Sequence, residues 1–159
     1  MKKYDSPRVF DNDILESISH VHPITPLCLW LPVVVYLIYQ SVQLHHLSWK
    51  TGVSCVSGLF IWSLTEYILH RFAFHFPAKS SLGKRIIFLF HGLHHQWPDD
   101  PSRLVMPPVP AVLLMSLLYA LFYLLIPRDY LDGFMAFFII GYLIYDYIHY
   151  ATHHFSMRS

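Results

Sequence analysis

Apolar runs separated by short polar stretches dominate the pattern of this chain. Four such runs occupy approximately residues 24–44, 53–69, 109–126 and 134–147. An α-helix needs about 20 predominantly apolar residues to cross the hydrocarbon core of a bilayer, and the runs are close to that length or slightly shorter. The pattern therefore predicts an all-α integral membrane protein. Its four apolar helices are expected to form two hairpins, joined by the polar stretches at 48–52 and 127–133.

The first 23 residues differ from the rest of the chain. Acidic residues and prolines occur among them, and no apolar stretch typical of a signal peptide appears before about residue 24. We therefore expect residues 1–23 to be a cytoplasmic N-terminal segment, followed by one membrane domain over residues 24–159.

Basic residues are distributed unequally between the two sides of the predicted membrane domain. If both termini and the loop after the second run share one side, that side carries nine of the eleven Lys and Arg residues. The other side keeps Lys50 and Arg128. Because cytoplasmic loops carry an excess of Lys and Arg, both termini are expected in the cytoplasm. A bacterial inner membrane or the endoplasmic reticulum would suit this topology.

Composition agrees with a membrane protein and narrows the possible partners. The chain is 55% hydrophobic, and its mean hydropathy is +0.41. Its formal net charge of +1 gives no basic surface of the kind that binds polyanions, so no nucleic acid partner is expected. Histidine is the unusual feature, because twelve histidines accompany only eleven Lys and Arg residues.

Ten of the twelve histidines lie on the predicted cytoplasmic side, and eight of these fall into three short clusters. Histidines at the level of the lipid head groups would explain two or three of them, but not this clustering. In the first cluster, His70 and His75 are five residues apart. On one continuous α-helix they would point about 140° apart, which favours two neighbouring sites over one. Glu66, one turn before His70, could orient its ring.

The other two clusters have helical spacing. In the second, the spacing i, i+3, i+4 would place all three imidazoles on one narrow helix face, and the residues are His91, His94 and His95. In the third, His149 and His153 are one turn apart, and Asp146 lies one turn before His149. A carboxylate in that position can accept the second ring N–H of a ligand histidine. Three clusters at one membrane face predict a metal site.

These residues form motifs that resemble a known family. The motifs are HX4H at His70 and His75, HGXHH at His91 to His95 with RLVMPP after it, and GYLIYDYIHYATHH. Together they resemble the fatty acid hydroxylase superfamily, and within it most closely the fatty acid 2-hydroxylases that modify sphingolipid acyl chains. The resemblance runs from about residue 5 to residue 155.

The resemblance implies an O2-dependent, non-haem di-iron hydroxylase of lipid acyl chains that acts at carbon 2. It implies a histidine-ligated dimetal centre on the cytosolic face. His154 is matched in only some members of the family. The implied ligands are His70, His75, His91, His94, His95, His149, His153 and His154. Imidazole binds zinc as well as iron, so purified material could contain zinc, but zinc has no redox chemistry and the reaction requires iron.

Two departures from the family pattern shape further expectations. No cytochrome b5-like domain precedes the membrane part, so electrons would come from a separate cytochrome b5-like or ferredoxin-like protein. A final HXXHH motif is missing, so the membrane domain is expected to be truncated at its C-terminus. This departure keeps an alternative open, a non-catalytic or incomplete metal-binding membrane protein of the same lineage.

Two other classes fit less well. A bis-histidine haem protein needs ligands that face each other within the helices, whereas these histidines cluster at helix ends. A transporter needs polar residues at mid-membrane, and the third and fourth runs contain almost none. The aromatic residues near the clusters could line a path for an acyl chain or anchor the interface. They are Phe72, Phe74, Phe76 and Trp97. For Arg103 the expected role is to position a loop.

Overall fold

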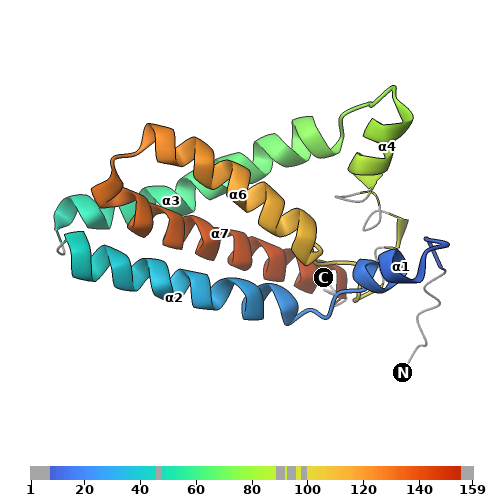
Figure 1. The fold of residues 1–159 in the computed structure, drawn as a ribbon, viewed down its shortest axis with the longest axis horizontal. Coiled ribbons are helices and arrows are strands. Elements are labelled where there is room, and N and C mark those ends of the chain that lie inside the picture. Colours follow the sequence, from blue (N-terminus) through green and yellow to red (C-terminus); the bar gives the residue numbers. More distant parts are fainter. Residues whose placement is uncertain (1–7, 46–47, 89–91, 93–95, 98–99, 155–159) are drawn as a thin grey trace, which may run out of the picture.

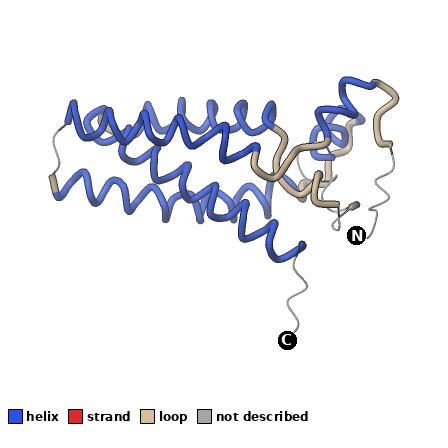
Figure 2. Tube along the Cα trace, turned by 90° about the horizontal axis from the view of Figure 1, so that it is seen from below, coloured by secondary structure: helices blue, strands red, loops and turns tan. Residues whose placement is uncertain are grey.

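The described part of the chain is helical, with loops and no strands (Figures 1 and 2). The computed structural model describes residues 8–45, 48–88, 92, 96–97 and 100–154. The helices are α1 (Asp13–Ser19), α2 (Thr25–His45), α3 (Trp49–Ile68), the π-helix η1 (Leu69–Phe74), α4 (Ser81–Ile87), α6 (Pro108–Leu125) and α7 (Arg128–His154).

Four segments are long and apolar enough to cross a membrane, as the sequence predicted. They are Thr25–Gln43, Trp49–Phe74, Pro108–Leu125 and Arg128–Thr152. Their outward faces carry large apolar side chains, such as Phe60 at 71% exposure and Leu124 at 80%, which suit contact with lipid. The chain is therefore a multi-pass membrane protein. In Figure 1, α1 and α4 lie beyond one end of the bundle, which we call the cap end.

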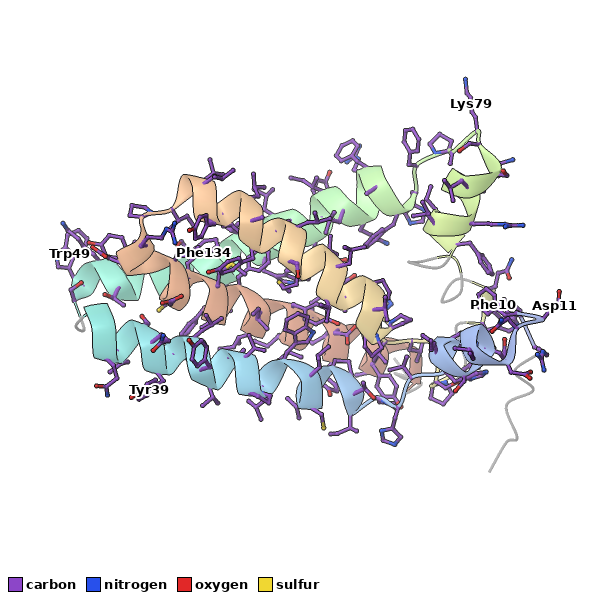
Figure 3. All side chains as sticks on the ribbon, viewed as in Figure 1. Phe10, Asp11, Tyr39, Trp49, Lys79 and Phe134 are labelled. Carbon is purple, nitrogen blue, oxygen red and sulfur yellow. The ribbon has the colours of Figure 1, made fainter. Side chains whose placement is uncertain are left out.

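Helix α7 forms the centre of the bundle. It packs most extensively against α3 and next against α2, whereas its contact with α6 is small. The most deeply buried side chains also come from α7, including Leu131, Met135 and Phe138. Phe134 of α7, labelled in Figure 3, packs with Phe138 against Phe122 of α6, with ring centroids 4.8 and 5.1 Å from that of Phe122. The expected grouping into two hairpins stays a prediction, because the main packing joins α7 to both members of the first pair.

Glycines allow α3 and α7 to approach closely. A Cβ atom added to Gly58 would lie 2.3 Å from the backbone oxygen of Phe134. One added to Gly141 would lie 2.9 Å from the Cβ of Trp62. Small residues at such positions let helix backbones pack tightly within a membrane. The close approach brings the C-terminal end of α3 alongside α7, where several of the predicted site residues lie.

Candidate metal centre

Helix α3 ends in the π-helix η1, and this change of winding brings His70 and His75 together. Their ring centroids are 4.8 Å apart, with the ring planes at 70°. The i→i+5 hydrogen bonding of a π-helix places more residues in each turn than an α-helix does. Positions five apart therefore return to nearly the same face. The expectation that the two rings diverge toward separate sites was wrong, because it assumed regular α-helical winding.

Glu66 and Tyr145 connect α3 to α7 beside this histidine pair. The Tyr145 hydroxyl donates a hydrogen bond to the Glu66 carboxylate. The Tyr145 ring also stacks on the His149 ring, with centroids 5.7 Å apart and planes at 16°. This contact restrains the orientation of His149. That Glu66 orients His70 stays a prediction.

Asp146 is a buried carboxylate in the same region, with only 6% of its surface exposed. Within the described part of the chain, its Oδ2 atom and the Tyr142 hydroxyl have no hydrogen-bond partner. Buried polar atoms normally have partners, so an unsatisfied carboxylate oxygen is a feature that needs an explanation. The role predicted for Asp146, accepting a ring N–H from His149, would explain this oxygen. It stays a prediction.

Several predicted ligands cannot be placed. His91, His94 and His95 lie outside the described residues, as do the side chains of His153 and His154 at the end of α7. Among the described side chains, no three His, Cys, Asp or Glu residues lie close enough together to hold a metal ion. The structure therefore brings together His70 and His75, and the complete dimetal centre stays a prediction.

Two spaces flank a wall formed by Trp62, Glu66 and Tyr145. The first, which we call the inner cavity, has a volume of about 70 Å³ and lies between α3, α6, α7 and residues 103–107. Asp146 and His149 line it. The second, which we call the outer groove, has a volume of about 760 Å³ and follows α3 and α7. His70 and His75 line the groove. The predicted site residues thus occupy both sides of one wall.

A polar network that sequence reasoning did not find holds one side of the inner cavity. The Arg103 side chain is fully buried, and its Nη2 atom donates to Glu16 Oε1 at 2.9 Å. Its Nε atom lies 3.3 Å from Asp100 Oδ2, and its guanidinium carbon lies 5.3 Å from the Trp97 ring centroid. Arg103 thereby joins α1 to the loop that forms a wall of the cavity. This geometry agrees with the loop-positioning role expected for Arg103.

His20 completes the network. Its Nε2 atom lies 3.0 Å from Arg103 Nη2, and its Nδ1 atom lies 2.7 Å from Ser102 Oγ. Ser102 Oγ in turn donates to Asp100 Oδ1 at 2.7 Å. The same Nε2 atom also lies 3.1 Å from Glu16 Oε1, so His20 links the carboxylate of α1 to the loop at Ser102. The helical spacing of Glu16 and His20 was visible in the sequence, but their partner is more than 80 positions away.

Glu16 is held in its charged form. Burial alone would raise the pKa of its carboxyl group. That effect is outweighed by hydrogen bonds from the backbone N–H groups of Phe10 and Val9, by a hydrogen bond to His20 and by the nearby Arg103 guanidinium. Together these contacts lower the pKa of Glu16 to about 2. The backbone donors lie 2.9 and 3.0 Å from Glu16 Oε2. The network therefore contains a carboxylate and a guanidinium that are both ionised at neutral pH.

Comparison with known proteins extends the structural result. A family model described as fatty acid hydroxylase matches residues 55–159, which is more than half of the chain. The chain belongs to the fatty acid hydroxylase family. The matched range contains every histidine that sequence reasoning assigned to the metal centre.

Individual relatives of the family cover most of this chain. Dihydroceramide fatty acyl 2-hydroxylase FAH2 of Arabidopsis thaliana is 34% identical over 150 residues, covering 94% of this chain and 63% of the relative. Human fatty acid 2-hydroxylase is 32% identical over 166 residues, covering 92% of this chain and 45% of the relative. Ceramide very long chain fatty acid hydroxylase SCS7 of Saccharomyces cerevisiae is 40% identical over 128 residues, covering 79% of this chain and 33% of the relative. The chain spans less than two thirds of the length of these relatives.

A solved structure supports the same fold. The structure is that of full-length scs7p, in which only the hydroxylase domain is visible. It superposes with a TM-score of 0.84 at 36% sequence identity, over 94% of this chain and 57% of that one. The helical arrangement described above is therefore shared with a hydroxylase domain.

Proposed function

We propose that this protein hydroxylates lipid acyl chains at carbon 2, with O2 as oxidant and electrons from a separate donor protein. The observation that carries the proposal is the π-helical pairing of His70 and His75 at one end of a long apolar groove. Membership of the fatty acid hydroxylase family supports it. So do the names of the relatives, which are fatty acid, dihydroceramide and ceramide hydroxylases. The protein would then be an oxidoreductase of lipid metabolism.

The proposed metal is iron at two sites. Imidazole nitrogens suit iron, and the His70–His75 pair offers two such donors within one π-turn. Bound iron would supply the redox chemistry that attack on an unactivated C–H bond by O2 requires, which zinc lacks. The proposed ligands are the eight histidines assigned by the family motifs, which are His70, His75, His91, His94, His95, His149, His153 and His154.

The surrounding residues would orient the ligands and exclude water. Asp146 is buried one turn before His149, where a carboxylate can fix the orientation of a ligand imidazole and increase its basicity. Glu66 has the same proposed role toward His70. Trp62 and Tyr145 separate the inner cavity from the outer groove and present apolar surface on both sides. The donor, cytochrome b5-like or ferredoxin-like, would reach the cap end from the cytoplasm.

The test is to express the chain in cells that make no 2-hydroxy fatty acids and to measure total lipid acyl chains by mass spectrometry. We expect 2-hydroxy products from the wild type. Replacing His70 and His75 together with Ala should abolish the product and lower the iron content of the purified protein by about tenfold or more, since both ligands of one turn are lost. The matched control is His22→Ala, at an exposed histidine whose Nδ1 accepts from the backbone N–H of Ile24 at 3.2 Å.

Each outcome is informative. Bound iron without any 2-hydroxy product in the wild type would favour a non-catalytic metal-binding protein of the same family. Product that persists in the double variant at the wild-type level would refute the assignment of His70 and His75. Products hydroxylated elsewhere along the chain would retain the reaction but reject carbon 2.

A further inference from the structure

The outer groove has the shape of a site for a single hydrocarbon chain. Two stripes of mainly apolar residues face each other along it, at helical spacing of three to four. From α3 these are Leu59, Ser63 and Tyr67, and from α7 they are Gly141, Ile144 and Ile148. Both stripes lie within membrane-spanning segments. Leu59 and His70 are eleven positions apart, which at about 1.5 Å per residue gives the groove a length of about 16 Å on α3.

Arg71 lies at the histidine end of this groove. It is the one Lys or Arg side chain among the described residues that line the groove. It donates a hydrogen bond to the Tyr67 hydroxyl, and its guanidinium carbon lies 5.6 and 5.5 Å from the ring centroids of Tyr67 and Phe72. These contacts hold an exposed cation in a defined place beside apolar surface, instead of leaving it free in solvent.

We infer that Arg71 binds the carbonyl-end oxygen of an acyl chain whose hydrocarbon tail lies in the outer groove. The inference rests on the proposed function and names the residue that selects the position of hydroxylation. The planar guanidinium presents several N–H donors that match a carboxylate, and it can also donate to an amide carbonyl oxygen. The groove thus offers a cation to the polar end of the substrate and apolar surface to its hydrocarbon tail.

The position of Arg71 explains why oxidation would occur near the carbonyl. Arg71 follows His70 directly and precedes His75 by four residues, and the two rings are 4.8 Å apart. Holding the carbonyl end at Arg71 places the adjacent carbon beside the histidine pair. The rest of the chain then extends toward Leu59, away from the histidines. An acyl chain anchored in this way presents carbon 2, and not a carbon in the middle of the chain.

The inner cavity is less suited to the same role. Its basic residue, Arg103, is fully buried and lies against the carboxylates of Glu16 and Asp100. A guanidinium that is already paired with two carboxylates is poorly placed to bind a substrate oxygen. Arg71 is exposed and contacts a neutral hydroxyl and two rings. Electrostatics therefore favours the outer groove for the carbonyl end.

The experiment uses the full chain in lipid nanodiscs and acyl probes with a photoreactive diazirine near the methyl end. One probe is a free fatty acid, and the other is an N-acyl sphingoid base with the same acyl chain. After irradiation, labelled peptides are identified by mass spectrometry. We expect labels at 59–63 and 141–144 with the free fatty acid in the wild type. Arg71→Ala should lower that labelling by about tenfold or more, the loss expected for a hydrogen bond to a charged group.

Further variants keep the test independent of folding. Arg71→Lys keeps the charge without the planar donor geometry and should retain part of the labelling. Tyr67→Phe removes the hydroxyl that accepts from Arg71 and should lower labelling in the same direction by a smaller factor. Arg85→Ala is the matched control, because it removes an exposed arginine of α4 that does not line the groove. Helicity measured by circular dichroism checks each fold.

Labelling does not require turnover, so this proposal and the proposed function can fail separately. Normal labelling without a hydroxylated product would reject the function and retain the anchor. Equal labelling in the wild type and Arg71→Ala would overturn the inference, as would the absence of labelling in the wild type or labels at Leu114 and Met115 of the inner cavity. A loss confined to the free fatty acid would identify a carboxylate as the bound group. A loss with both probes would extend the role to an amide carbonyl.

Discussion

At the scale of single residues, the most constrained charge in the described structure is Arg103. A buried guanidinium without partners would be strongly destabilising, and here Glu16, Asp100 and the Trp97 ring surround it. Each partner belongs either to α1 or to the segment just before Arg103. The network therefore fixes α1 at the cap end and gives the loop beside the inner cavity a defined shape.

The depressed pKa of Glu16 predicts how stability depends on pH. A carboxyl group whose pKa is lower in the folded state stabilises the fold above its unfolded value and ceases to do so as pH falls through the folded value. For Glu16 the unfolded and folded pKa values are 4.5 and about 2. We expect the thermal midpoint of the wild type in detergent to exceed that of Glu16→Gln by about 2–4 °C at pH 7, for a difference of about 1 kcal/mol. The two midpoints should converge near pH 2.

The control for this prediction is Asp13→Asn in the same helix. Asp13 forms an ion pair with Arg8, but 90% of its side chain is exposed, and exposed pairs contribute little. Its midpoint should follow the wild type at every pH. A constant offset of Glu16→Gln from pH 7 to pH 2 would show that the charge of Glu16 is not what stabilises the network.

At the scale of elements, the π-helix decides the geometry of the first histidine pair. Sequence patterns assign helices well because apolar spacing is regular, but they do not show where the winding changes. With the regular α-helical winding of about 100° per residue, the HX4H spacing separates His70 from His75. One additional residue per turn reverses that conclusion. The sequence did contain a signal for the pairing of His70 and His75, since two histidines of one motif are expected to act together.

This view predicts the effect of changing the length of η1. Deleting Ala73 would give an HX3H motif, and in an α-helix that spacing again places both rings on one face. We expect this variant to keep the iron content of the wild type, measured by elemental analysis. Inserting one alanine after Ala73 should weaken metal binding by about tenfold or more, because neither winding aligns the rings. Loss of metal in both variants would indicate that the π-turn itself is required.

At the scale of the whole molecule, hydropathy was sufficient to predict the number and approximate limits of the spanning helices. It could not predict that α7 is central, because packing between helices in a membrane depends on shape more than on hydrophobicity. Gly58 and Gly141 determine that packing through contacts with Phe134 and Trp62, which lie about 80 positions away along the chain. The Arg103 network was not predictable for the same reason.

The arrangement of the cap end predicts membrane topology. Phe10, Asp11 and Lys79 lie at one end of the molecule and Trp49 at the other (Figure 3). In a variant without native cysteines, single cysteines at Asp11 and Lys79 should react with an impermeant thiol reagent only from the cytoplasmic side. Cysteines at Lys50 and Asp129 should react only from the opposite side. Labelling of Asp11 and Lys79 from different sides would contradict the four-span topology.

The central position of α7 has a consequence for biosynthesis. A membrane chain is inserted from its N-terminus, so α2, α3 and α6 enter the bilayer before the helix against which two of them chiefly pack. Until then each must persist alone in lipid, which their apolar outward surfaces permit. His70 and His75 are likewise synthesised before α7 supplies Asp146 and His149. Under the proposed function, a newly made chain becomes able to accept both metals only after α7 is in place.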